Sequence, residues 1–103
     1  SWGSFRVLDV EDASMTIKIT LTPGHGMNYH SHENRDEVWT VISGTGHAIL
    51  DGVRRDVKAG DILTMPAGCR HTVFADSELK IIEVQLGPAI SVEDKQKYPL
   101  PQA

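Results

Sequence analysis

The chain has 103 residues, and its 10 Lys and Arg against 14 Asp and Glu give a formal net charge of −4. This length is enough for one hydrophobic core and too short for two, which predicts a single domain over residues 1–103. The few scattered basic residues do not supply the positive surface of a nucleic-acid or anionic-membrane binder. We therefore expect small molecules or proteins as partners, with no nucleic acid and no membrane.

The cellular compartment is inferred from features that the sequence lacks. No apolar run reaches the roughly 20 residues that span a bilayer, and no charged and apolar leader pattern opens the chain. The single cysteine, Cys69, has no second cysteine with which to form an internal disulfide, which fits a reducing environment. We expect a cytoplasmic protein.

In chain order, the sequence reads as a series of short strands. Residues 15–21 alternate strictly between apolar and polar side chains, which is the period of a strand with one buried face. Similar β-rich runs occur at residues 5–10, 37–42, 47–50, 61–65, 71–75 and 79–86. Gly, Pro, Asp and Asn separate these runs, so we predict an all-β sandwich or barrel of antiparallel strands. Only residues 91–98 favour a short C-terminal helix, and the alternative there is an irregular tail.

Two histidines stand two positions apart in the stretch HSH, residues 30–32. On a strand such positions point the same way, so His30 and His32 can present both rings to one point inside a barrel. The polar segment that follows, residues 33–36, is expected to turn the chain. Glu37 would then open the next strand and face the two histidines.

A third histidine follows a tight turn later in the chain. Pro66 and Gly68 form that turn and should deliver His71 to the start of another strand. Three neutral imidazoles and one carboxylate suit a borderline divalent ion, and they leave one or two positions for water or substrate. We therefore predict a metal site whose ligands are His30, His32, Glu37 and His71.

These positions match both sequence motifs of the cupin family. The first motif is a Gly, His-x-His, a Glu and a closing Gly, and the second is a Gly, Pro-x-Gly and a His. The matching residues are Gly24, His30, His32, Glu37 and Gly44, then Gly60, Pro66, Gly68 and His71. The second motif departs at its last position, where the family often has Asn and this chain has Ala75. The resemblance implies a double-stranded β-helix, or jelly-roll barrel, that holds one divalent transition metal ion. Zinc is our first choice, with Mn, Fe, Ni and Co as alternatives.

Segments outside the motifs narrow the resemblance. Residues 2–10, 35–46 and 80–94 resemble, in order and spacing, the cupin part of type II mannose-6-phosphate isomerases. In that family the isomerase is usually fused behind a mannose-1-phosphate guanylyltransferase, whose nucleotidyltransferase half has no counterpart in these 103 residues. The ligand loop HSHENRDEVW is about two residues longer than in the family, and Val38 replaces a His.

The resemblance implies an aldose–ketose isomerase that interconverts mannose 6-phosphate and fructose 6-phosphate. In such a reaction the metal would stabilise the charge of an enediolate while a base moves a proton between adjacent carbons. The candidate bases are Glu33, Asp36 and His25. The candidate substrate-binding residues are Arg35 and Arg70, as phosphate grips, and Trp39, as a pocket wall.

Two other classes of function stay open. Three His and one Glu with open positions also suit an Fe or Mn dioxygenase or another oxidoreductase. A non-catalytic sugar-binding or regulatory module could use the same pocket without a base. In each case a homodimer is expected, because the face of residues 37–42 opposite Glu37 carries Val38 and Ile42 and cupins commonly pair.

Overall fold

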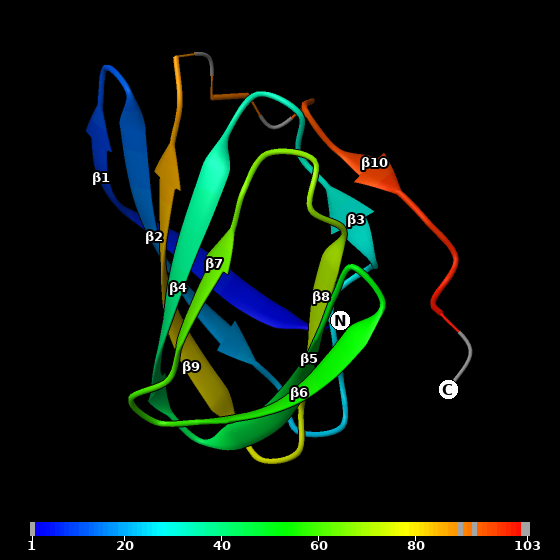
Figure 1. Cartoon of the computed structure of the whole chain (residues 1–103). Coiled ribbons are helices and arrows are strands. Elements are labelled where there is room, and N and C mark those ends of the chain that lie inside the picture. The colour runs from blue at the N-terminus through cyan, green and yellow to red at the C-terminus, as the bar shows by residue number, and fades with distance from the viewer. Residues whose placement is uncertain (1, 89, 92, 102–103) are drawn as a thin grey trace.

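The computed structural model of the chain describes residues 2–88, 90–91 and 93–101. Two five-stranded antiparallel sheets face each other and form a jelly-roll sandwich (Figure 1). The described part of the chain contains strands, turns and bends but no helix, and therefore no helix that could cross a membrane. The predicted all-β class is confirmed.

Each sheet draws its strands from distant parts of the chain. The first sheet has the order β1 (Gly3–Glu11), β2 (Ser14–Leu21), β9 (Leu79–Leu86), β4 (Asp36–Ser43) and β7 (Ile62–Met65). The second has the order β10 (Gln96–Lys97), β3 (His30–Ser31), β8 (His71–Ala75), β5 (Thr45–Leu50) and β6 (Val53–Lys58). Hydrophobic side chains from both sheets meet in one core, which includes Ile81 and Trp39 from the first sheet and Val73 from the second.

The strands form where the alternation of side chains predicts them. Burial alternates along β2, β4 and β9, so one face of each strand points into the sandwich. In the register of β4 and β9, Glu37 lies opposite Gln85, Trp39 opposite Glu83 and Val41 opposite Ile81. These cross-strand rows carry the buried face from one end of the sandwich to the other.

Strand β6 was not among the predicted runs. Its sequence VRRDVK is mostly charged, so it lacks the apolar alternation that marks strands such as β2 and β9. A hairpin turn places it beside β5, and both central residues of that turn, Asp51 and Gly52, have positive φ. An Asp-Gly pair is favoured in such turns, and it was the signal that could have revealed the strand.

The C-terminal segment is a tail rather than the helix that residues 91–98 favoured. Gln96 and Lys97 form β10 and pair with β3, and the amide of Tyr98 donates to the carbonyl of Tyr29 at 2.8 Å. Pairing with another part of the chain thus overrides the local helix signal. Figure 1 shows β10 beside β3, at the edge of the second sheet.

Candidate metal centre

Three histidines from two neighbouring strands meet inside the sandwich. His30 pairs directly with His71 across β3 and β8, and His32 follows β3. The ring centroids lie 4.3 Å apart for His30 and His71, 4.8 Å for His30 and His32, and 5.4 Å for His32 and His71. All three rings are buried, and one ring nitrogen of each lies within 4.8 Å of the others. Small ring rotations would bring three such nitrogens to the roughly 2.1 Å bond length of a metal ion.

The other nitrogen of each ring contacts a backbone carbonyl. His30 Nδ1 lies 2.6 Å from the carbonyl oxygen of Asn28, and His71 Nδ1 lies 3.0 Å from that of Cys69. His32 Nδ1 lies 2.6 Å from the carbonyl oxygen of Asp94. A carbonyl can only accept, so each Nδ1 carries the proton and donates it. In a neutral ring Nε2 then keeps its lone pair, which is the form that binds a metal.

The rings of His30 and His32 are kept neutral by their surroundings. Burial, followed by the charge of His71, lowers the pKa of His30 to about 3, although its bond to Asn28 opposes the shift. Burial also lowers the pKa of His32, against the opposing effects of Asp94 and Glu37. Neutral imidazole is the form required of a ligand, so the electrostatics of the site fit metal binding.

Glu37 is the carboxylate beside the three histidines. Its Oε2 lies 3.2 Å from His32 Nε2, and its Oε1 lies 3.5 Å from His71 Nε2. Burial alone would raise its pKa, but His71, His32 and Arg35 outweigh burial and lower the pKa to about 2. His71 Nε2 is buried and has no hydrogen-bond partner among the residues described. A carboxylate facing a bare imidazole nitrogen favours a cation between them, so this donor set fits a divalent ion.

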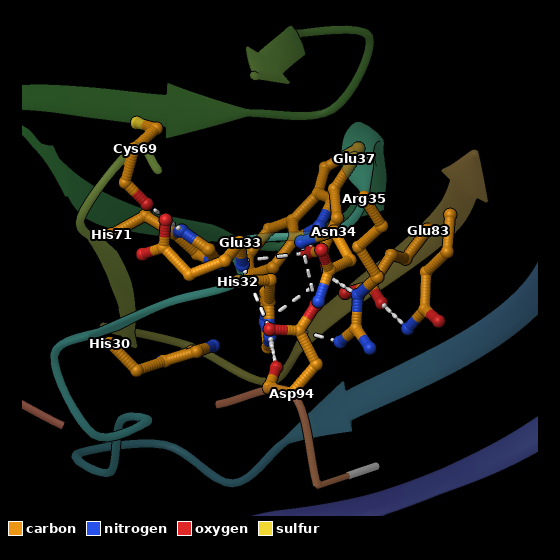
Figure 2. Close-up of polar contacts among 12 residues, drawn as sticks. His30, His32, Glu33, Asn34, Arg35, Glu37, Cys69, His71, Glu83 and Asp94 are labelled. Carbon is orange, nitrogen blue, oxygen red and sulfur yellow. Dashed lines mark hydrogen bonds and ion pairs between the residues drawn. The ribbon is translucent and has the colours of Figure 1, made fainter. Parts of the chain in front are cut away.

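Two donors hold Glu37 from the other side. The indole Nε1 of Trp39 donates to Oε1 at 3.0 Å, and Arg35 Nε donates to Oε2 at 2.8 Å. Arg35 also donates to His32 Nε2 at 3.1 Å and to the carbonyl of Ser91 at 3.1 Å. Figure 2 shows the guanidinium between the carboxylate and the C-terminal segment. Arg35 therefore balances the negative charge of Glu37.

His30 and His32 open onto a cavity of about 390 Å³. One wall is apolar and comes mainly from β1 and β2. Its residues are Trp2, Phe5, Val7, Met15, Ile17, Ile19, Met27 and Ile90. The polar side holds His30, His32, Arg35, Glu37, Glu83, Gln85 and Lys95. Such a cavity can take a small molecule with one end at the histidines and its body against the apolar wall.

Glu83 and Gln85 were missed in the analysis of the sequence. Both are buried on β9, and Gln85 Nε2 donates to Glu83 Oε2. Burial, followed by the negative charge of Glu37, raises the pKa of Glu83 to about 8. The sequence could have revealed them, because alternate residues of a strand share one face. Glu83 and Gln85 thus lie on the same face of β9 as the buried Leu79 and Ile81. Polar residues at inward positions of a strand mark a polar cavity.

The three candidate bases lie outside the cavity lining. His25 is exposed in the loop after β2, and Glu33 is exposed in the loop after β3. Asp36 is exposed at the start of β4, where it accepts a hydrogen bond from the amide of Ala67 at 2.8 Å. The structure thus brings the predicted metal ligands together and leaves these three side chains apart from them.

The candidate substrate-binding residues divide in the same way. Arg35 and Trp39 line the cavity, and both touch Glu37. Arg70 is exposed and does not line it; its guanidinium lies 3.8 Å from the centre of the Tyr98 ring. Arg70 therefore helps to hold the C-terminal segment, which packs against this side of the site.

That segment, residues 93–98, is called the C-terminal strap below. The carboxylate of Asp94 accepts hydrogen bonds from the amides of Glu33 at 2.9 Å and Asn34 at 2.8 Å. These bonds lower the pKa of Asp94. They also place the Asp94 carbonyl on His32 Nδ1, so the strap helps to orient one of the three histidines (Figure 2).

Comparison with known sequences identifies the family of this domain. A family model described as a cupin domain matches residues 17–85. A mannose-1-phosphate guanylyltransferase from Klebsiella pneumoniae is 24% identical over 95 residues, which cover 90% of this chain and 20% of that protein. The chain thus spans about one fifth of the length of this curated relative.

Solved structures share the fold at low sequence identity. A salicylate 1,2-dioxygenase from Pseudaminobacter salicylatoxidans matches with a TM-score of 0.79 and 15% identity, covering 84% of this chain and 27% of the other. The structure of KdgF from Halomonas sp. matches with a TM-score of 0.78 and 21% identity, covering 84% and 80%. These matches agree with the jelly-roll architecture.

Proposed function

This chain belongs to the cupin family, and we propose that it is a metal-dependent member that acts on a small molecule. The observation that carries the proposal is the arrangement of His30, His32 and His71, each of which directs Nδ1 to a backbone carbonyl. This leaves the Nε2 atoms of His30 and His71 for one ion. His32 Nε2 would join them once the Arg35 guanidinium, which donates to it, moved aside, and Glu37 is the proposed fourth ligand. Zinc, Mn, Fe, Ni and Co are the candidate ions.

The reaction that we propose is aldose–ketose isomerisation of a sugar phosphate, with mannose 6-phosphate and fructose 6-phosphate as the pair. Similarity to a mannose-1-phosphate guanylyltransferase over 90% of this chain supports a mannose phosphate as substrate. A bound divalent ion would supply electrostatic stabilisation of the negative charge that develops on the substrate oxygens. The apolar wall would exclude water from the reacting carbons.

The proton must be moved by a group inside the cavity. Besides Glu37, Glu83 is the carboxyl group that lines the cavity in the described part of the chain. We assign the proton transfer to Glu83 because its side chain lines the cavity. Glu33, Asp36 and His25 do not line it. Glu83→Gln should abolish turnover while metal content is kept, and Glu33→Gln, on the exposed loop, is the matched control.

A coupled assay tests the proposal by following fructose 6-phosphate formed from mannose 6-phosphate. The protein is first stripped with a chelator and then loaded with each candidate ion in turn. We expect turnover with at least one ion and none in the stripped protein or in His71→Ala. Absence of turnover with every ion would remove the isomerase, and binding of the sugar phosphate without product would favour a non-catalytic module.

One observation favours an oxidoreductase as the second candidate. The cavity wall formed by Phe5, Val7, Met15 and Ile17 is more apolar than a sugar phosphate requires. A dioxygenase or related enzyme using Fe or Mn would accept a less polar substrate at the same three histidines. Iron in the purified protein, together with oxygen consumption on a small aromatic substrate, would support this reading against isomerisation.

We also propose that residues 1–103 act as one cupin domain and associate as a homodimer in the cytoplasm. Exposed apolar side chains on the outer face of the first sheet, Ile42 and Ile62, support association. Light scattering should give the mass of two chains, and the mass of one chain at working concentration would contradict the dimer.

A further inference from the structure

Lys95 lies on the C-terminal strap at a point where the backbone is held on both sides. Asp94, immediately before it, is bonded to the amides of Glu33 and Asn34. Gln96, immediately after it, pairs with Ser31 in β10 and β3. The side chain of Lys95 lines the cavity that also holds His30 and Glu37. The strap therefore holds the backbone of Lys95 at a fixed position beside the cavity.

The charge of Lys95 has no partner in the described part of the chain. No ion pair or hydrogen bond involves its side-chain nitrogen there. Lys95 is exposed as a whole residue; partial burial, followed by the charges of Lys97 and Arg35, lowers its pKa, and the charge of Glu37 opposes the shift. An unpaired cation beside a cavity is stabilised when an anion enters.

The other cationic side chains of this region are already engaged. Arg35 donates to Glu37, His32 and the Ser91 carbonyl, so its charge is balanced by the Glu37 carboxylate. Arg70 stacks on the Tyr98 ring and does not line the cavity. Lys95 is therefore the positive charge of the lining that forms no direct ion pair with a carboxylate in the described part of the chain, although the charge of Glu37 acts on it.

We propose that Lys95 is the oxyanion-binding residue of the cavity. The ligand is then a small molecule that carries a phosphate or a carboxylate for Lys95, with the rest of its body between the histidines and the apolar wall. This inference rests on the proposed metal-dependent function, and it assigns to Lys95 the anion contact that Arg35 and Arg70 were expected to make.

The test compares ligand pairs that differ only in charge. Calorimetry on the zinc-loaded protein measures the binding affinity of each ligand. The affinity for mannose 6-phosphate is compared with that for mannose, and the affinity for benzoate with that for benzyl alcohol. The first pair reports a phosphate and the second a carboxylate. The wild type should prefer the charged member of at least one pair. Lys95→Met should weaken binding of that charged member about tenfold or more and leave the neutral member unchanged.

Three control variants accompany Lys95→Met. Lys97→Met removes a neighbouring lysine that does not line the cavity, and it should behave as the wild type. Lys95→Arg keeps the charge and should retain the preference. Equal zinc content and equal thermal unfolding of the variants exclude a general loss of structure.

The outcomes separate this inference from the proposed isomerase. Equal binding of charged ligands by the wild type and Lys95→Met, or no binding of either anion by the wild type, would overturn it. Lys95-dependent binding without turnover would support it and remove the isomerase. Turnover of mannose 6-phosphate with an unchanged KM in Lys95→Met would keep the isomerase and overturn the role of Lys95.

Discussion

The two ends of the sandwich interior are built by the same strands but carry opposite chemistry. Along β4 the inward side chains pass from Glu37 through Trp39 to Val41, and along β9 from Gln85 and Glu83 to Ile81 and Leu79. Strand β8 repeats the change, from His71 to Val73 and Ala75. One end thus carries the polar and ionisable side of the cavity, and the other is packed hydrocarbon. Stability and chemistry are therefore separated along each strand rather than assigned to different strands.

The separation predicts different responses to metal at the two ends. At the polar end, buried charges depend on one another, and the charge of Glu37 is balanced by Arg35. At the apolar end, side chains such as Leu79 and Ile81 contribute by burial alone. Substitutions at the polar end should therefore be sensitive to added metal, and those at the apolar end should not.

The largest effect is expected for Arg35→Met in the metal-free protein. It leaves the buried Glu37 carboxylate without its guanidinium, which should lower the free energy of unfolding by about 3 to 5 kcal/mol. Zinc should restore much of this loss, because a cation then faces Glu37 again. Urea unfolding in chelator and in zinc measures both values, and an equal loss in the two conditions would contradict the comparison.

Leu79→Ala should lower the free energy of unfolding by about 2 to 5 kcal/mol, because it leaves a cavity in the hydrocarbon end. Leu79 is 0% exposed, whereas Leu86 on the same strand is 43% exposed. Leu86→Ala is therefore the matched control and should change stability by no more than about 0.5 kcal/mol. The loss in Leu79→Ala should be the same with and without zinc, and a zinc-dependent loss would show that the two ends are coupled.

His71→Ala should lower zinc affinity by at least about 100-fold. Loss of a partner that only orients a ligand already costs roughly 10-fold to 100-fold, and loss of a ligand should exceed that. Competition with a chromophoric chelator measures the affinity. The control is His25→Ala, an exposed histidine outside the cavity. Zinc binding by His71→Ala at the affinity of the wild type would disprove the proposed site.

The smallest effect is a pH dependence that comes from Glu83. Its pKa is raised from 4.5 to about 8 in the folded chain, so between these values the folded state binds more protons than the unfolded state. Stability in chelator should therefore fall as pH rises from 7 to 8, by at most about 1.4 kcal/mol. Glu83→Gln should remove this slope, and Glu78→Gln, an exposed carboxyl, should keep it. A slope that persists in Glu83→Gln would contradict the assignment.

The strands could be predicted from the sequence wherever the alternation of apolar residues matches the alternation of burial in the fold. The alternation in residues 15–21 and 79–86 correctly predicted β2 and β9, and the Pro66 and Gly68 turn correctly placed His71 at the start of β8. Strand β6 was missed because charged residues make up most of its sequence VRRDVK, which therefore has no apolar period. The C-terminal helix was favoured because local capping signals do not reveal pairing with a distant strand such as β3.

The candidate site could be predicted only in part, because local sequence patterns do not show which distant strands meet. His30, His32 and His71 are close in space because strand spacing and turns determine their positions. Glu83, Gln85 and Lys95 reach the cavity through β9 and the strap, which no local pattern around the histidines reveals. Sequence proximity suggested Glu33 and Asp36 instead, yet the loop that holds them faces solvent.

The carbonyls of Asn28, Cys69 and Asp94, which accept the Nδ1 protons of the three histidines, belong to the main chain. Every amino acid carries such a carbonyl, so substitutions at positions 28 and 69 can replace the side chains without removing the acceptors. At position 94 the carboxylate is also needed, because it holds the strap that carries the carbonyl. The protonation of the three histidines therefore depends mainly on the path of the backbone. Distant relatives that keep this path would keep the Nδ1 protons of the three rings even where most surrounding side chains differ.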